Sequence, residues 1–270
     1  MRRWWLGLAL LLASCDYEVQ QPLQLSFAPA AGRAMDAFSK LNVQLFTADG
    51  SKVFSKVKTQ NAGDSGFGSL SLDLADGTYT VVAVGHSSVN SATIKSPELV
   101  QFTASNGTKV SDTFCACQRI EVAAGTSYSL TMERVTAMFR LTMEDEPIPD
   151  GVTKLVFDYT GGSANFNPTT SEGCTKSTQS ETRMFTGLGE YEVFTFPYMA
   201  DSCRVRMTIS ALDAAGHTIH TRTFESVPMV RNRITEYRGR FFSDTSDPWA
   251  VVLLKFTANT TWDGIYTFQF

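Results

Sequence analysis

Cys15 is the residue whose sequence context most directly indicates chemistry. It ends the stretch Leu12-Ala13-Ser14-Cys15, which has the small residues and the final cysteine of a bacterial lipobox. Two arginines and the short apolar run 4–12 precede it, as in a secretory signal peptide. We therefore predict that residues 1–14 are removed and that the Cys15 thiol carries a lipid such as palmitate. The alternative is an ordinary secretory signal in which the cysteine is incidental.

Four further cysteines, Cys115, Cys117, Cys174 and Cys203, lie in the mature chain. An exported protein reaches an oxidising compartment, so these thiols could pair in any of three connectivities. Cys115 and Cys117 share a predicted strand, where their Cα atoms would be near the outer limit for a bridge. Cys174 and Cys203 are geometrically freer and are the predicted pair. A single C-x-C with distant partners gives little support for a metal site, and we predict none.

Three other groups of residues resemble catalytic or metal sites. Gly63-Asp64-Ser65-Gly66 is similar to the chymotrypsin nucleophile motif, but every histidine follows it, whereas in that family the histidine precedes the serine. His217 and His220 would point to opposite faces of a strand. Glu144-Asp145-Glu146 could supply a carboxylate pair for glycoside hydrolysis, although a solvated loop is the commoner origin of such a run. We therefore predict that the chain is not an enzyme and needs no cofactor.

The charge of the chain excludes one class of partner. The formal net charge of −4 argues against a nucleic-acid partner, which would require a basic patch. Beyond the signal peptide, no segment is long and apolar enough to span a bilayer. The lipid on Cys15 would therefore be the only membrane anchor.

Alternation of apolar and polar residues with a period of two dominates the mature chain, and this is typical of β-strands. The strands predicted on this basis are 23–27, 41–45, 78–85, 120–122, 128–132, 135–143, 154–159, 205–211, 217–224, 235–241 and 262–270. The run 78–85 is apolar on both faces, which predicts a strand in the middle of a sheet. Ser96-Pro97-Glu98 has the cap and first-turn proline of a short helix. The polar stretch 163–182 indicates a long loop.

Many short strands with frequent turns predict an all-β protein built as a sandwich or barrel. Both halves of the chain show the same pattern of short alternating strands and turns. We therefore predict two β-sandwich domains, at residues 15–133 and 134–270. No linker rich in proline or glycine separates them. The domains should therefore pack against each other rather than swing freely.

Several loose motifs occur in a characteristic order along the mature chain. They are the lipobox ending at Cys15, Leu41-Asn42-Val43-Gln44-Leu45-Phe46 before a turn, Asp76-Gly77-Thr78-Tyr79-Thr80-Val81-Val82-Ala83, Arg134-Val135-Thr136-Ala137-Met138-Phe139-Arg140-Leu141 leading into Ile148-Pro149, 156–159 with Phe166-Asn167 beyond it, and Arg231-Asn232-Arg233-Ile234-Thr235. In this order the chain resembles the FimB/Mfa2-type fimbrial anchor lipoproteins of Bacteroidetes, part of the type V pilus system. The resemblance implies two transthyretin-like β-sandwich domains. It also implies an outer-membrane location, where the anchor holds the pilus base by strand exchange with a shaft pilin.

The resemblance leaves other roles open. Shaft and tip pilins or adhesins of the same family share the fold, and a carbohydrate-binding surface lipoprotein would be a further role. Such a lipoprotein should expose aromatic residues, for which Trp249, Trp262, Tyr191 and Tyr198 are candidates, although core packing explains aromatics equally well. Asp16-Tyr17-Glu18 does not closely match a surface-export signal. We expect a surface-facing protein, and a periplasm-facing attachment stays open.

Arg33 bears on the choice between anchor and pilin. In the family, as the resemblance implies, a pilin loses its first strand to an arginine-specific protease, and a neighbour's C-terminal segment fills the groove. Arg33 is the nearest arginine after 23–27, in a small-residue loop. A cut there would separate the fold from the lipid on Cys15, so we predict that Arg33 stays uncut in an anchor. The apolar run 249–270 would then be offered to a partner, or would instead close the second sandwich internally.

Overall fold

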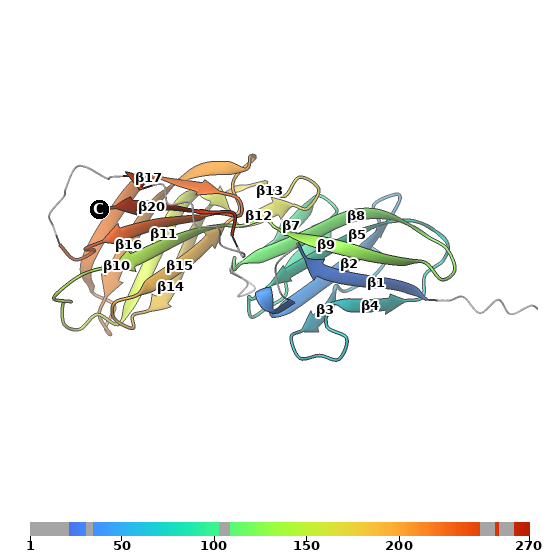
Figure 1. Cartoon of the computed structure of the whole chain (residues 1–270), viewed down its shortest axis with the longest axis horizontal. Coiled ribbons are helices and arrows are strands. Elements are labelled where there is room, and N and C mark those ends of the chain that lie inside the picture. The colour runs from blue at the N-terminus through green and yellow to red at the C-terminus, as the bar shows by residue number, and fades with distance from the viewer. Residues whose placement is uncertain (1–21, 31–34, 103–108, 244–251, 254–261) are drawn as a thin grey trace, which may run out of the picture.

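The computed structural model describes residues 22–30, 35–102, 109–243, 252–253 and 262–270. Cys15, Arg33 and Trp249 therefore lie outside the described residues. Within them the regular structure is β apart from one short 3-10 helix, η1 (Met35–Ala37). The all-β prediction is confirmed. Figure 1 shows an elongated molecule in which two β-rich lobes lie side by side.

The first half of the chain forms a seven-stranded sheet of order β3-β2-β5-β8-β9-β1-β4. Its strands are β1 (Leu23–Pro29), β2 (Lys40–Thr47), β3 (Lys58–Asn61), β4 (Ser69–Leu72), β5 (Gly77–His86), β8 (Thr113–Val122) and β9 (Ser127–Arg134). β5 lies between β2 and β8, as its apolar residues on both faces predict. β1, β2, β5, β8 and β9 turn alternate side chains into one apolar cluster. β1 runs parallel to β9 and antiparallel to β4.

The second half forms two sheets, with orders β15-β10-β18-β20-β19 and β14-β11-β16-β17. Its strands are β10 (Ala137–Met143), β11 (Lys154–Ser163), β14 (Lys176–Met184), β15 (Glu190–Thr195), β16 (Ser202–Leu212), β17 (Thr218–Val230), β18 (Ile234–Gly239), β19 (Val252–Leu253) and β20 (Ile265–Gln269). A second apolar cluster fills the space between them. β10 repeats the position of β1, since it pairs parallel with β18 and antiparallel with β15.

A small fourth sheet joins the two halves. It consists of β6 (Thr93–Ser96), β7 (Leu99–Gln101), β12 (Asn165–Asn167) and β13 (Glu172–Gly173), in the order β13-β12-β7-β6. β7 of the first half pairs antiparallel with β12 of the second, which places Phe166 opposite Val100. A third apolar cluster draws on both halves around this sheet. Figure 1 shows β7, β12 and β13 between the two lobes.

The joining sheet corrects two predictions. Ser96-Pro97-Glu98 does not start a helix but lies at the turn between β6 and β7, where the Glu98 N–H donates to Ser96 Oγ at 3.2 Å. The flanking Ile94 and Val100 are buried, and strand pairing across the joint stabilises the extended conformation there. The stretch 163–182 is not a loop, because β12, β13 and most of β14 lie within it. Its strands lack an apolar face and so escape a test based on hydrophobic alternation.

Two glycine positions show how turns and bulges shape the strands. The predicted turn after β2 is present, with Gly50 at φ +83° and the Val53 N–H donating to the Leu45 carbonyl at 2.8 Å. β11 was expected to end at Gly161-Gly162 but continues to Ser163 through a bulge. Gly161 has φ +107°, and a Cβ there would lie 2.5 Å from the Arg204 carbonyl oxygen. Only glycine fits such an approach, so here it marks a bulge rather than a strand end.

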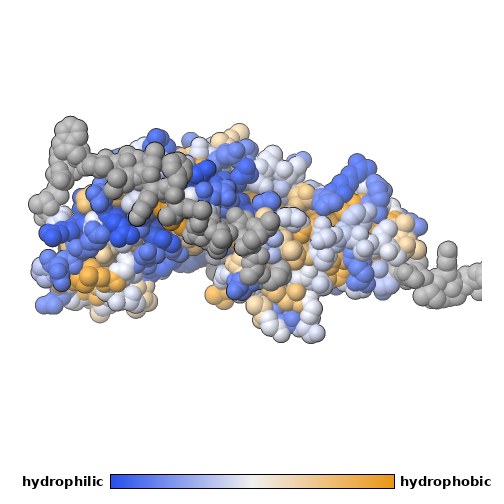
Figure 2. All heavy atoms as spheres, viewed as in Figure 1, coloured by the Kyte–Doolittle hydropathy of each residue, from blue (hydrophilic) through white to orange (hydrophobic). Residues whose placement is uncertain are grey.

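The surface seen in Figure 2 is mostly hydrophilic over the second half, and its hydrophobic residues form separate patches. The large apolar side chains that the described residues expose are Val89, Met184, Leu188, Met199 and Ile219. They lie on different elements and so do not build one broad apolar face. Among the described residues, no helix has the length and apolarity needed to cross a membrane.

Candidate assembly site

β1 is the first candidate, because it is the strand that follows the predicted lipid site. Its side chains alternate strictly, and Leu23, Leu25 and Phe27 are each at most 2% exposed. Burial of such side chains stabilises a fold by roughly 1.5–3 kcal/mol each. β1 lies inside the sheet between β4 and β9. Removal of β1 would leave a groove between β4 and β9.

The predicted strand 23–27 is thus present, two residues longer than expected. In the structure it lies between β4 and β9 of its own chain. Cys15 and Arg33 themselves lie outside the described residues. Lipid attachment and resistance to cleavage remain predictions.

The outer edges of the first-half sheet are joined by one side chain. Gln60 of β3 donates from Nε2 to the Ser69 carbonyl of β4 at 2.6 Å, and its Oε1 accepts the Gly68 N–H at 3.0 Å. β3 and β4 are the two ends of the strand order. Gln60 therefore satisfies edge groups that could otherwise pair with another chain.

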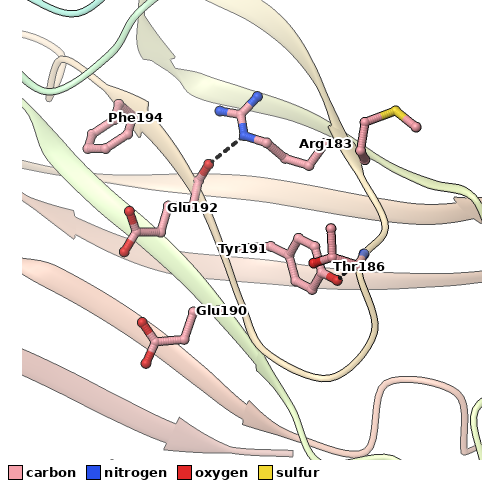
Figure 3. Close-up of a pocket in the computed structure, with 7 residues that line it drawn as sticks. Arg183, Thr186, Glu190, Tyr191, Glu192 and Phe194 are labelled. Carbon is pink, nitrogen blue, oxygen red and sulfur yellow. Dashed lines mark hydrogen bonds between the residues drawn. The ribbon is translucent and has the colours of Figure 1, made fainter.

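The outer edge of β15 is capped in a similar way. The Met143 N–H donates to the Gly189 carbonyl, and this register turns the backbone groups of Glu192 and Phe194 away from β10. Arg183 Nε donates to the Glu192 carbonyl at 3.0 Å, and Tyr159 Oη donates to the Phe194 carbonyl at 2.8 Å. Figure 3 shows Arg183 reaching across to Glu192. Side chains from the opposite sheet thus occupy the acceptors of this edge.

A pocket of about 560 Å³ opens beside this edge. Arg183, Met184 and Thr186 line one side of it, and the other side is lined by residues of β15. The carboxylates of Glu190 and Glu192 are held by Arg140, at 3.2 and 2.7 Å. Tyr191 Oη accepts the Thr186 N–H at 3.0 Å (Figure 3). The polar groups of the pocket therefore serve the fold, and their arrangement gives no acid–base pair.

β20 is the second candidate for assembly. It pairs parallel with β18, and among the described residues β19 follows it as the outer strand of the sheet. Phe268 stacks on Tyr237 at 4.8 Å, and Phe270 packs edge-on against Phe224 at 5.0 Å. β20 nevertheless stays partly exposed. The described part of the C-terminal run therefore packs within the second half of its own chain. This is the second of the two alternatives that the sequence left open for the run 249–270.

The residues considered for catalysis have structural partners. Asp145 is 3% exposed, and its two oxygens accept the N–H groups of Phe241 and Phe242 at 2.7 Å each. Glu144 pairs with Arg238 at 3.2 Å. The interpretation of this run as a solvated loop is therefore wrong for Asp145, which anchors the chain after β18.

The remaining motifs are equally explained by the fold. Gly63-Asp64-Ser65-Gly66 forms the turn between β3 and β4, where Asp64 Oδ2 accepts the Asn61 N–H at 2.7 Å. His217 contacts Asp213 at 3.1 Å on the surface, and the His220 ring packs on Phe241 at 5.1 Å. The described residues contain no cluster of three or more His, Cys, Asp or Glu that could hold a metal ion.

The aromatic candidates do not form a shared binding face. Tyr191 and Trp262 are 5% and 6% exposed and take part in packing. Tyr198 is half-buried and has Lys176 Nζ 5.2 Å from its ring centre. Trp249 lies outside the described residues.

The four described cysteines are free thiols in the structure. Burial raises the pKa of the Cys203 thiol, against the smaller opposing effects of the Tyr198 N–H and Lys176. Gly173, next to Cys174, pairs with Tyr198, so both predicted partners lie near the same residue. The Cys174–Cys203 disulfide stays a prediction.

A protein-family model described as fimbrillin-A associated anchor proteins Mfa1 and Mfa2 matches residues 14–258. The chain belongs to this family. An adhesin candidate from Bacteroides ovatus is 16% identical, with 75% of this chain and 77% of that chain covered and a TM-score of 0.50. The anchor protein Mfa2 of Porphyromonas gingivalis is 12% identical over 75% of this chain and 81% of its own, with a TM-score of 0.40. The tip protein Mfa3 of that species, solved with a C-terminal truncation, is 12% identical over 83% and 96%, with a TM-score of 0.40. The comparison with curated proteins finds no match.

Membership of the Mfa1/Mfa2 anchor family confirms the resemblance seen in the sequence. Of the motifs that carried it, the lipobox lies outside the described residues, and the others lie mainly in β2, β5, β10, β11 and β12 and in the turn before β18. Gln60 and Arg183, the side chains of edge strands that cap the sheet edges, were not found from the sequence. Their only sequence signal is a polar residue at an inward position of an edge strand, and the strand itself has to be known before that signal can be read.

Proposed function

We propose that this protein is the lipid-anchored subunit that holds the base of a fimbria at the outer membrane by strand exchange with a shaft pilin. It is proposed to face the cell surface, and its partners are the pilin and, through the lipid, the membrane. The observation that carries the proposal is the order of Cys15 and β1. A lipid on Cys15 is connected to the fold through β1, whose three apolar side chains belong to the core of the first half. A pulling force on the fimbria would then reach the membrane through a buried strand.

The capped edges support strand exchange over lateral strand addition. Gln60 caps β3 and β4, and the side chains of Arg183 and Tyr159 cap β15. The better candidates for a strand that is exchanged with another subunit are therefore β1 and β20. In an anchor β1 must stay. We therefore propose that β20, which pairs with β18 in the isolated chain, leaves its own sheet when it is offered to a pilin.

We also propose the division into domains at residues 15–133 and 134–270. β9 ends at Arg134 and β10 begins at Ala137. The first apolar cluster uses residues up to Met132, and the second begins at Ala137. Each half then has its own core, and the joining sheet connects them.

The test is the substitution Cys15→Ala in a host that assembles the fimbria. We expect the variant to leave the outer-membrane fraction, because a stable anchor needs covalent acyl chains. Fimbriae should then appear in the medium. Cys117→Ala, which removes a thiol elsewhere, should stay in the membrane and keep fimbriae attached.

Mass spectrometry of the mature chain separates the remaining roles. An anchor should begin at a lipidated Cys15 and retain β1. A chain beginning at Ala34 would show cleavage after Arg33 and would identify a shaft or tip subunit. Membrane retention of Cys15→Ala at the wild-type level would contradict the lipoprotein assignment.

A further inference from the structure

Arg134, the last residue of β9, is the most highly connected side chain at the joint between the halves. Its side chain is 3% exposed. Nε and Nη2 donate to the two carboxylate oxygens of Asp112 at 2.7 Å each. Nη1 donates to Asn232 Oδ1, in the turn between β17 and β18, at 3.1 Å. The guanidinium thus ties the end of the first half to the second half.

Trp262, just before β20, covers this guanidinium. The Arg134 Cζ atom lies 3.7 Å from the Trp262 ring centre and 4.7 Å from that of Phe114. The indole is also part of a small apolar cluster with Met138 and Ile234. A cation held on an aromatic face away from water is strongly favoured. The residues around the Trp262 ring therefore come from both halves of the chain.

Asn232 links the same segments through its backbone. Its N–H donates to the Thr136 carbonyl at 2.8 Å, and its carbonyl accepts the Asp263 N–H at 2.9 Å. Its φ of 58° lies in the left-handed region, where asparagine is one of the few residues with a side chain that is readily accepted. The segment after Trp262 is thus bonded to the residue that Arg134 also contacts.

We propose that Arg134 and Trp262 form a clasp that couples the seating of the C-terminal strand β20 to the rigidity of the joint. When β20 is seated, the indole covers Arg134 and the Asp263 N–H is satisfied by Asn232. When β20 leaves, Arg134 loses its aromatic cover and Asn232 loses one bond. Because coupling between two sites is reciprocal, loosening the joint must also loosen β20. This coupling goes beyond the proposed function, since it holds for the isolated chain whatever its place in a fimbria.

Hydrogen exchange on the full mature chain tests the clasp. We expect Trp262→Ala to speed exchange about tenfold or more in β20, and also at the end of β9 and around Asp112. Gln269→Ala is the matched control, because it changes an exposed side chain of β20 that lies outside the clasp. Gln269→Ala should leave exchange in β20 and at the end of β9 as in wild type.

The reciprocal variant is Asp112→Asn, which weakens the hold on Arg134 and leaves every side chain of the C-terminal segment in place. We expect faster exchange in β20 from this change in the first half. The proposal is overturned if Asp112→Asn leaves β20 at the wild-type rate. It is also overturned if Trp262→Ala speeds exchange in β20 and leaves the end of β9 and the residues around Asp112 at the wild-type rate. Should Trp262→Ala fail to fold, the Asp112→Asn result alone decides.

Discussion

The buried polar side chains that the structure describes are hydrogen-bonded, and each of them stabilises a part of the fold. His86 is fully buried, and its Nδ1 accepts the Ser88 N–H at 3.1 Å. Its Nε2 must then carry the proton and donate to Asn42 Oδ1 at 2.9 Å. Asn42 Oδ1 also accepts the Ala92 N–H at 2.8 Å. The neutral imidazole thus holds the segment after β5 against β2.

His86 should make stability depend on pH. Burial, with Lys40 nearby, lowers the pKa of His86 from 6.5 to about 4. Protonation therefore favours the unfolded chain, so the contribution is complete above pH 6.5 and is lost as pH falls toward 4. Between pH 7 and pH 5 the free energy of unfolding should fall by about 2 kcal/mol.

Urea unfolding at the two pH values measures this loss. His86→Gln should unfold more easily at pH 7 and lose most of the pH dependence. His217→Gln, which changes a histidine on the surface, should keep the wild-type dependence. Equal pH dependence in His86→Gln and wild type would show that other groups cause the loss.

At the scale of the elements, apolar alternation predicts the core strands and misses the polar ones. β5 and β16 were predicted from their apolar residues, and both are central in their sheets. β14 was missed because its inward side chains include Gln179, which bonds to Thr195 of the opposite sheet, and Glu181, which pairs with Arg183 of the same strand. Residues such as Thr195, which accepts the Ser163 N–H and donates to Gln179, become recognisable as partners only once the strands are paired. The prediction of a lipid on Cys15 rests on a local sequence signal, whereas the edge caps and the clasp join residues far apart in the sequence.

The seating of β20 depends on a glycine in the neighbouring strand. A Cβ on Gly239 of β18 would lie 2.0 Å from the Phe270 carbonyl oxygen. Gly239→Ala should therefore push the end of β20 away from its sheet. Limited digestion with chymotrypsin, which cuts after aromatic residues, should release C-terminal peptides several-fold faster than in wild type.

Gly264→Ala is the matched control for this substitution. Its Cβ would meet only Arg233 Nη1, at 3.0 Å, and the end of a flexible side chain can move away. This variant should be digested at close to the wild-type rate. If Gly239→Ala were digested no faster than Gly264→Ala, the end of β20 would not depend on this contact.

At the scale of the whole molecule, the joint makes the two halves one body. Phe166 and Phe196 of the second half pack at 4.7 Å from each other, inside a cluster that includes Phe46, Val100 and Phe102 of the first half. Phe102 in turn contacts both Phe196 and the His86 ring, at 5.5 and 5.3 Å. A flexible linker would give no such shared core. The structure therefore supports the expectation that the halves pack firmly against each other.

A shared core should make unfolding a single step, and the chain offers two probes to test this. Circular dichroism follows the strands of both halves, whereas the fluorescence of Trp262 reports on the joint, where its ring covers Arg134. In urea, both signals should give one midpoint, because losing either half exposes the joint cluster. Phe166→Ala should lower that midpoint for both probes together, at a loss of about 3–5 kcal/mol for a buried phenylalanine. A circular dichroism curve with two steps, only one of which coincides with the fluorescence change, would show instead that the halves unfold independently and that the joint couples them weakly.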